Sequence, residues 1–496
     1  MVFSSLFFLF VFLTLCYGIY LCMPSIKAKN AVLLIFSLIF YAWGGPPLVL
    51  LLCLMTFICF VGAHLIWAQN PTPRRPVLHK GYKRFYLVVT VWLCLALLGL
   101  FKYAGFFGDT FFGILGLENI IPKVALPIGI SFYTFQLISY VIDVYRGEVE
   151  PQKKFWLLLL YASLFHQCIA GPIVRYSDVN EELENRRVTR EDAARGITRF
   201  ACGLAKKAVL ANGCAAIVSE MVEKPENLSA VPAAGILLAA VCYMLEIYLD
   251  FSAYSDMAIG MGLMVGFHYR ENFMYPYAAD SVTDFWRRWH ISLSSFFRDY
   301  VYIPLGGNRV GKLRHIFNLF AVWFLTGLWH GASWNFVLWG LYYFVFLIIE
   351  KLVFRVGKTP SRGILRVLRT AYTLVVVLFG WMLFYYTDLS ELWVAVKGLF
   401  TLNGNAWMNL SVQSGLLSHA VFLPIAMLAC TPIAPAVGRF FERLRGRMTE
   451  RRSGGMGKVA VTVYDAVTAV LPVLLVFLSL LCLVGDSYNP FLYFQF

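Results

Sequence analysis

The chain has 496 residues, of which 59% are apolar and only 14% are charged. Soluble domains carry roughly 45 to 50% apolar and about 25% charged residues, so this composition excludes a soluble fold and indicates a polytopic membrane protein. The formal net charge is +14, from 42 basic and 28 acidic residues. In a membrane protein such an excess reflects topology and attraction to anionic lipids, so we expect membrane lipids and no nucleic acid as partners.

Apolar runs without charged residues predict the transmembrane helices in chain order. The first third of the chain contains six of them, near residues 6–23, 31–43, 48–67, 85–101, 124–142 and 155–169. Further candidates follow near residues 200–222, 231–249, 316–349, 371–386, 416–437 and 466–484. Together they predict an all-α fold with about 11 to 13 transmembrane helices.

Three basic loops predict the orientation of these helices. Residues 68–84, 350–369 and 439–458 are rich in Lys and Arg, which places them in the cytoplasm by the positive-inside rule. Counting three spans back from the first loop places the amino terminus outside. The topology between residues 175 and 315 stays open, because charged and aromatic residues alternate there as in re-entrant or amphipathic helices that line a cavity.

His330 lies in a run that is too long for one membrane crossing. Residues 316–349 contain no Asp, Glu, Lys or Arg, and as a single helix they would extend about 51 Å. We therefore predict a turn at residues 329–333, where a glycine and two small residues occur. This turn leaves His330 at membrane depth, where an ionisable group indicates function. A neutral imidazole bonded to a backbone carbonyl is an equally good interpretation.

Residues 283–292 predict an amphipathic helix with Trp286 and His290 on one face. Two interpretations remain open. The segment is either a surface helix anchored by tryptophan and arginine, or it holds His290 over a buried tunnel. In the second case Arg287, Arg288 and Arg298 would attract a phosphorylated ligand, because guanidinium groups bind phosphate bidentately. We add Asp284 and Asn335 to this predicted donor-binding set.

Other polar residues at membrane depth compete with these two histidines. His166 and His64 also lie in apolar runs, and without a family resemblance His166 cannot be ranked below His330. Glu246 and Asp250 share a helix face, where helix-linking contacts are favoured over binding of an acceptor hydroxyl. No metal-binding spacing and no serine nucleophile motif occurs, so we expect no metal and favour a histidine that acts as general base on an alcohol.

The central third of the chain resembles the membrane-bound O-acyltransferase (MBOAT) family. The matching segments are DFSAYSDMAIG at 250–260, ENF at 271–273, FWRRWHISLS at 285–294, RDY at 298–300, YIPLGGNR at 302–309 and GLWHGA at 327–332. Residues 1–5, 170–176 and 488–494 further resemble the alginate O-acetyltransferase (AlgI-type) subgroup. The resemblance therefore extends over nearly the whole chain.

This resemblance implies a site and a fold. His330 would be the catalytic histidine and His290 the second family histidine, whose role is less fixed because other branches carry Asn or Asp there. Residues 1–496 would form one integral-membrane domain, a ring of helices around a central funnel and tunnel. Its catalytic core would be residues 124–350, with peripheral helices in 1–123 and 365–496.

The resemblance also implies a reaction. Acetyl-CoA or another acyl thioester would supply an acetyl group from the cytoplasm, without a permanently bound cofactor. An extracytoplasmic partner resembling SGNH hydrolases would place the acetyl group on a polysaccharide such as alginate, at the bacterial cytoplasmic membrane. An acyl carrier protein is a further possible partner. Alternatives are D-alanyl or other acyl transfer to teichoic acid or peptidoglycan, as in the DltB and PatA branches, or a non-enzymatic transporter or flippase that uses His330, Glu246 and Asp250.

Overall fold

The computed structural model describes residues 1–70, 80–121, 126–223, 227–353, 362–450, 455–485 and 491–492, and these residues contain helices and no β-strand. The expected all-α fold is therefore confirmed. Parts of the three basic loops, at 71–79, 354–361 and 451–454, lie outside the described residues.

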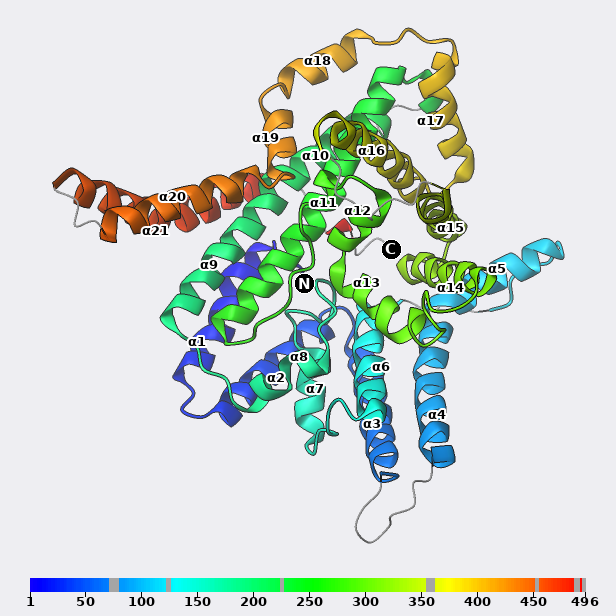
Figure 1. Ribbon diagram of the computed structural model, residues 1–496, viewed down its shortest axis with the longest axis vertical. Helices are drawn as coiled ribbons and strands as arrows, with labels where there is room; N and C mark the ends of the chain where they lie inside the picture. Colours follow the sequence, from blue (N-terminus) through cyan, green and yellow to red (C-terminus); the bar gives the residue numbers. More distant parts are fainter. Residues whose placement is uncertain are drawn as a thin grey trace.

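The helices follow one another in the order labelled in Figure 1. The first eleven are α1 Thr14–Cys22, α2 Ile26–Ala42, α3 Pro46–Trp67, α4 Lys80–Leu98, α5 Ala104–Ile114, α6 Ile130–Arg146, α7 Phe155–Ser163, α8 Tyr176–Glu184, α9 Arg190–Ala205, α10 Asn212–Val218 and α11 Ala233–Met264. The others are α12 Val282–Arg288, α13 Ile291–Phe297, α14 Lys312–His330, α15 Trp334–Ile348, α16 Gly363–Tyr385, α17 Leu389–Thr401, α18 Leu410–Ser418, α19 Phe422–Ala429, α20 Ile433–Glu450 and α21 Gly455–Gly485.

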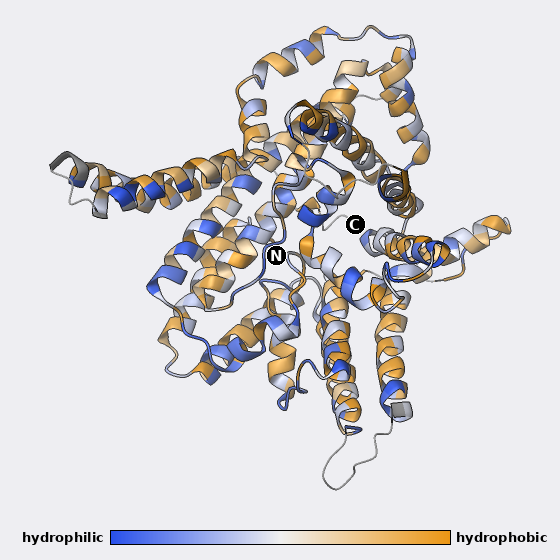
Figure 2. Ribbon diagram, in the orientation of Figure 1, coloured by the Kyte–Doolittle hydropathy of each residue, from blue (hydrophilic) through white to orange (hydrophobic). Residues whose placement is uncertain are grey.

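Helix α11 lies at the centre of the molecule and packs along α9 (Figure 1). Within its most apolar stretch 83% of the residues are buried by the protein itself, against 11% for α21. Helices α20 and α21 pack on each other and project from the body as a pair (Figure 1). Figure 2 shows hydrophobic residues along most of α3 and α4, as expected for helices that face lipid.

The number of membrane crossings differs from the predicted 11 to 13. Seven helical stretches of the described residues are long and apolar enough to cross a membrane: Pro46–Trp67, Gly81–Ile114, Arg190–Glu223, Ala233–Met264, Trp334–Val353, Gly363–Tyr385 and Lys458–Val484. The pair α18 and α19, bent by 64°, would be an eighth. Some predicted spans correspond to helices that are too short: α7 has nine residues, about 14 Å, against a hydrocarbon thickness of about 30 Å. The predicted count is therefore not confirmed.

The predicted turn in the 316–349 run is present. Helix α14 ends at His330, Gly331 is extended, and α15 begins at Trp334. The two helices approach closely because Gly340 faces the Trp323 carbonyl and Gly327 faces the Phe336 carbonyl, where a Cβ atom would overlap the oxygen in each case. This close packing holds His330 at the tip of a helical hairpin.

Candidate active site

His330 ends α14 inside a group of aromatic side chains. Its ring centroid lies 4.8 Å from that of Trp339, 5.0 Å from Trp329 and 5.3 Å from Phe384. The side chain is buried, and its Nε2 has no hydrogen-bond partner among the described residues. His330 lines a cavity of about 20 Å³, together with Ile247, Asp250, Phe251, Trp289, Trp381, Phe384 and Leu492. An imidazole nitrogen without a partner beside a cavity is available to exchange a proton with a ligand.

The helix predicted through residues 283–292 is wrong in its second half. Helix α12 ends at Arg288, and His290 has a left-handed backbone with φ of 45°. The cause is Asn272, whose carbonyl accepts the Ile291 N–H at 2.9 Å and whose Oδ1 accepts the Ser292 N–H at 3.1 Å. These bonds take the backbone donors that a continuing helix would direct to its own carbonyls. Trp286 and His290 consequently do not share a helix face.

Asn272 also sets the chemical state of His290. Its Oδ1 lies 3.2 Å from His290 Nδ1 and accepts the Ser292 hydroxyl at 2.9 Å. Because Oδ1 can only accept, the neutral His290 ring carries its proton on Nδ1 and presents an unprotonated Nε2. That Nε2 is buried and has no hydrogen-bond partner in the part of the chain that the structure describes. The Nε2 atom of His290, like that of His330, is therefore available to accept a hydrogen bond or a proton from a ligand.

The Trp329 ring brings the two histidines into one site. Its centroid lies 5.6 Å from that of His290 and 5.0 Å from that of His330. The Trp329 carbonyl accepts a hydrogen bond at 2.5 Å from Lys102, which also donates to Ser131 Oγ at 3.1 Å. The hydroxyl of Tyr103 donates to the Leu328 carbonyl at 2.8 Å. Lys102 and Tyr103 thus satisfy carbonyls that the end of α14 leaves without helical partners.

The competing histidines have partners. His166 Nε2 lies 3.1 Å from the Tyr17 hydroxyl, and its Nδ1 lies 3.3 Å from the Tyr269 hydroxyl. His64 Nδ1 donates to the Phe60 carbonyl at 2.8 Å, one helical turn earlier. These contacts are those of histidines that link or stabilise helices, so the structure separates them from His290 and His330.

Two carboxylates of α11, those of Asp250 and Asp256, link helices, as the sequence favoured for Asp250. Asp250 forms an ion pair with Lys207 at 2.6 Å, and one of its oxygens accepts the backbone N–H of Leu492 at 2.8 Å. Asp256 pairs with Arg199 at 2.9 Å and with Lys206 at 2.5 Å. Asp250 also lines the His330 cavity, so a carboxylate held by a lysine lies beside the candidate base.

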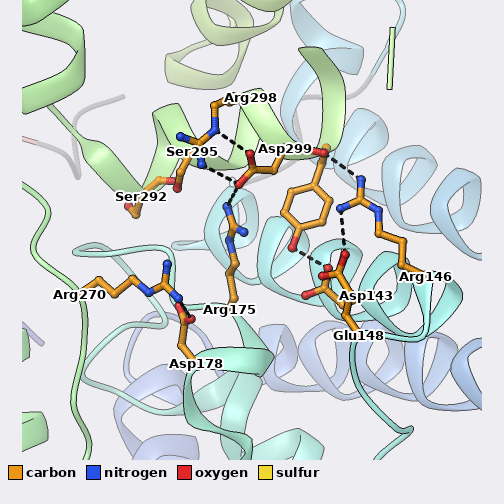
Figure 3. A network of polar contacts seen from close by, with 11 residues as sticks. Asp143, Arg146, Glu148, Arg175, Asp178, Arg270, Ser292, Ser295, Arg298 and Asp299 are labelled. Carbon is orange, nitrogen blue, oxygen red and sulfur yellow. Dashed lines mark hydrogen bonds and ion pairs between the residues drawn. The ribbon is translucent and has the colours of Figure 1, made fainter. Parts of the chain in front are cut away.

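The three arginines of the predicted donor-binding set occupy different surroundings. Arg288 pairs with Asp284 at 2.9 Å on the same helix, whereas Arg287 is exposed and forms no ion pair within the described residues. Arg298 binds Asp299 at 2.6 Å (Figure 3). Asn335 is buried and donates to the Phe384 carbonyl at 3.2 Å, which places it near the aromatic group around His330.

Arg298 belongs to a polar network that sequence reasoning missed (Figure 3). Asp299 also accepts a bond from Arg175 at 2.6 Å, and the guanidinium groups of Arg146 and Arg175 each lie 5.1 Å from the Tyr300 ring. Burial raises the pKa of Asp299, but the bonds from Arg298 and Arg175 outweigh it and hold that pKa below its usual value. Asp299 therefore stays ionised and fixes both arginines.

A second missed residue is Glu350, whose buried carboxylate caps α12. It accepts the backbone N–H groups of Val282 at 2.6 Å and Thr283 at 2.8 Å. A carboxylate is favourable at a helix amino terminus. Lys102 could have been found as an ionisable residue next to an apolar run, whereas nothing local in the sequence marks Asn272 or Glu350 as partners of distant backbone groups.

The chain is similar over most of its length to proteins of one family of membrane enzymes. Residues 33–396 match the model of the MBOAT, membrane-bound O-acyltransferase family. The chain is 36% identical to the probable alginate O-acetylase AlgI of Pseudomonas putida over the full length of both proteins. It is 42% identical to the probable alginate O-acetylase AlgI of Pseudomonas syringae over 77% of this chain and 72% of the relative. Identity to the peptidoglycan O-acetyltransferase of Helicobacter pylori is 32%, over 84% and 82% respectively. This chain therefore belongs to the membrane-bound O-acyltransferase family, as a multi-pass membrane enzyme that transfers acyl groups to hydroxyl oxygens.

Proposed function

We propose that this enzyme moves an acetyl group from a cytoplasmic thioester, acetyl-CoA or a carrier-bound acyl group, to an acceptor on the other side of the membrane. The observation that carries the proposal is the partnerless Nε2 of His330 beside a cavity at the break between α14 and α15. Family membership favours acyl transfer over the transporter hypothesis.

In this mechanism His330 is the general base. Its Nε2 removes the proton from an acceptor hydroxyl, and the oxygen attacks the thioester carbonyl carbon. The carbon–sulfur bond breaks, and the leaving thiolate takes the proton back from the imidazolium. The aromatic side chains around His330 exclude water, which limits hydrolysis of the thioester. We propose His290, held by Asn272, as the second catalytic histidine, which orients the acceptor or the thioester.

The donor would bind on the side of Arg287, Arg288 and Arg298. Asp284 and Asp299 orient two of these guanidinium groups by ion pairs, so an anionic donor would meet preorganised cations. The buried Oδ1 of Asn335 has no hydrogen-bond partner, and it would contact the part of the donor nearest to His330. No resident cofactor is required, because the thioester carries the activated acyl group.

The acceptor is proposed from the relatives. The AlgI relatives of Pseudomonas putida and Pseudomonas syringae are named probable alginate O-acetylases, which supports an exopolysaccharide of the alginate type. The peptidoglycan O-acetyltransferase relative makes peptidoglycan the second candidate. An extracytoplasmic partner resembling SGNH hydrolases would complete the transfer. We further propose a location in the bacterial cytoplasmic membrane, an outside amino terminus, cytoplasmic basic loops and a catalytic core at residues 124–350.

The first test is transfer of labelled acetyl from acetyl-CoA to a hydroxyl acceptor by the purified enzyme in proteoliposomes. His330→Ala should lower the rate about 10² to 10⁴-fold, the usual contribution of a general base. His64→Asn is the matched control, because it removes another intramembrane histidine and should keep activity. If His330→Ala, verified for expression and insertion, left polysaccharide acetylation in cells unchanged, the proposed base would be wrong.

The second test concerns the donor. A triple variant, Arg287→Ala, Arg288→Ala and Arg298→Ala, should weaken donor binding by at least tenfold, because hydrogen bonds between charged groups contribute about 1.5 to 3 kcal/mol each. Direct titration with acetyl-CoA measures this change. Normal donor affinity in the triple variant would remove the role assigned to these arginines, without affecting that of His330.

A further inference from the structure

A second cavity, of about 590 Å³, opens between the end of α1, the start of α2 and the segment that leads into α9. Four basic side chains line it: Lys29, Arg186, Arg187 and Arg190. None of the described residues that line this cavity is acidic. The short loop between α1 and α2 is one of those expected on the cytoplasmic side of the membrane.

These four cations form no ion pair within the part of the chain that the structure describes. The nearby acids are engaged elsewhere: Glu182 binds His268 at 2.7 Å and Glu191 pairs with Arg195 at 2.5 Å. Asp192 bonds to Thr189 as part of a helix cap. The positive charge of the cavity is therefore not neutralised by the protein.

Arg186 is fixed at the back of this group. It is only 8% exposed, and its Nε donates to the Val265 carbonyl at 2.8 Å and its Nη1 to the Glu182 carbonyl at 3.1 Å. Its guanidinium lies 4.5 Å from the Phe267 ring, and its Nη2 has no hydrogen-bond partner within the described ranges. A buried cation with only neutral partners is costly unless an anion compensates it.

Two helices begin at the cavity and add to its positive potential. Ser25 and Ile26 at the start of α2, and Thr189 and Arg190 at the start of α9, are among the lining residues. The amino-terminal ends of helices carry partial positive charge and favour phosphate groups. The carboxylate of Asp192 reduces this effect at α9 but not at α2.

Apolar side chains at the rim indicate that the ligand is an amphiphile. Leu21 and Val188 line the cavity and are 73% and 40% exposed. A soluble phosphate needs no such rim, whereas a lipid would place its headgroup among the cations and its acyl chains along the exposed side of α1. We propose that this cavity is a binding site for the phosphate group of an anionic phospholipid in the leaflet of the basic loops.

The test compares two variants of the purified full-length protein. One carries Lys29→Gln, Arg187→Gln and Arg190→Gln in the cavity, and leaves the buried Arg186 intact. The matched control carries Arg439→Gln, Arg443→Gln and Arg447→Gln, which remove the same charge from exposed positions of α20. Native mass spectrometry and titration in detergent measure binding of phosphatidylglycerol, with phosphatidylcholine as the neutral reference.

We expect the cavity variant to bind phosphatidylglycerol about a hundredfold more weakly, since each basic side chain near a membrane surface contributes about fivefold. The control should change by less than threefold, and phosphatidylcholine binding should not change. Val188→Glu, which puts an anion at the rim, should also weaken phosphatidylglycerol binding. Equal phosphatidylglycerol affinity in the cavity and control variants would overturn the proposal. Displacement of the lipid by millimolar inorganic phosphate would assign the site to free phosphate and overturn the proposal that its ligand is a phospholipid.

Discussion

Two groups of buried histidines in this molecule resemble each other in sequence and differ in structure. His166 and His290 are completely buried and His330 is 6% exposed, so burial does not distinguish them. The difference lies in the hydrogen bonds. Both ring nitrogens of His166 face tyrosine hydroxyls, whereas Nε2 of His290 and Nε2 of His330 have no partner. A buried polar atom without a partner among the described residues is unfavourable, which makes it a candidate for contact with a substrate.

The surroundings explain this difference. His166 lies among polar tyrosines that connect α1, through Tyr17, with the segment after α11, through Tyr269. His330 lies among Trp329, Trp339 and Phe384, whose ring faces provide no strong acceptor or donor to an imidazole nitrogen. A histidine with both ring nitrogens hydrogen-bonded, such as His166, stabilises this fold, whereas one that leaves a ring nitrogen among aromatic side chains keeps that nitrogen available to a ligand.

The largest effects are expected when one histidine of each group is replaced by asparagine. His330→Asn should lower transfer activity about 10² to 10⁴-fold and leave thermal unfolding nearly unchanged. His166→Asn should do the reverse. It leaves the buried Tyr269 hydroxyl without its histidine partner, whereas Tyr17 keeps its bond to the Met261 carbonyl. We expect it to destabilise the protein by about 1 to 3 kcal/mol, with normal turnover per folded molecule.

Acetyl transfer and thermal unfolding, measured on the same detergent preparations, check both variants. Loss of turnover in fully folded His166→Asn protein, at a level similar to His330→Asn, would show that hydrogen bonding does not separate the two groups. His64→Asn is the common control, because its side chain bonds only within its own helix.

The sequence was sufficient to predict the hairpin around His330. The apolar run at 316–349 is too long for one crossing, and glycine marks its break, so the position of the turn follows from local properties. The all-α fold and the competing intramembrane histidines follow from composition in the same way. The number of spans was harder to predict, because apolar runs such as that of α7 form short helices buried against other helices instead of crossing lipid.

The surroundings of His290 could not be predicted, because they depend on a distant residue. Local periodicity favours a helix through residues 283–292. Asn272, 18 positions before His290, takes the backbone donors of Ile291 and Ser292 and ends that helix. Likewise, Glu350 caps α12 from a segment 68 residues away. Tertiary hydrogen bonds of this kind override local propensity.

Replacement of Asn272 tests its contact with His290 and Ser292. Asn272→Ala removes the acceptor of the His290 Nδ1 proton and of two Ser292 donors, so the ring loses its fixed tautomer and orientation. We expect transfer activity to fall roughly ten- to hundredfold, by analogy with losses on removing the partner of a functional histidine. Asn272→Asp keeps an acceptor at the same place and should retain most of the activity.

Transfer rates as a function of pH provide the readout that a purely structural role would not change. Misorientation of His290 should alter the pH profile of Asn272→Ala, while Asn272→Asp should shift the profile to higher pH, because a carboxylate beside His290 favours the protonated imidazole. If both variants lost activity equally and with an unchanged profile, Asn272 would act only through the fold of the α12–α13 turn.

The smallest effects are expected at Lys102 and Tyr103, which bind the end of the helix that carries His330. Lys102 and Tyr103 hold the last carbonyls of α14, those of Trp329 and Leu328. Lys102→Met keeps most of the side-chain volume but removes the donor to Trp329, the residue before His330, and should lower kcat about tenfold, because small displacements of a catalytic group are costly. Tyr103→Phe removes the donor one residue further away and should lower kcat only a few-fold.

The KM for the acyl donor should stay constant in both variants, since neither Lys102 nor Tyr103 contacts the arginines. An unchanged kcat in Lys102→Met, or a change in KM alone, would show that the end of α14 positions His330 without help from Lys102.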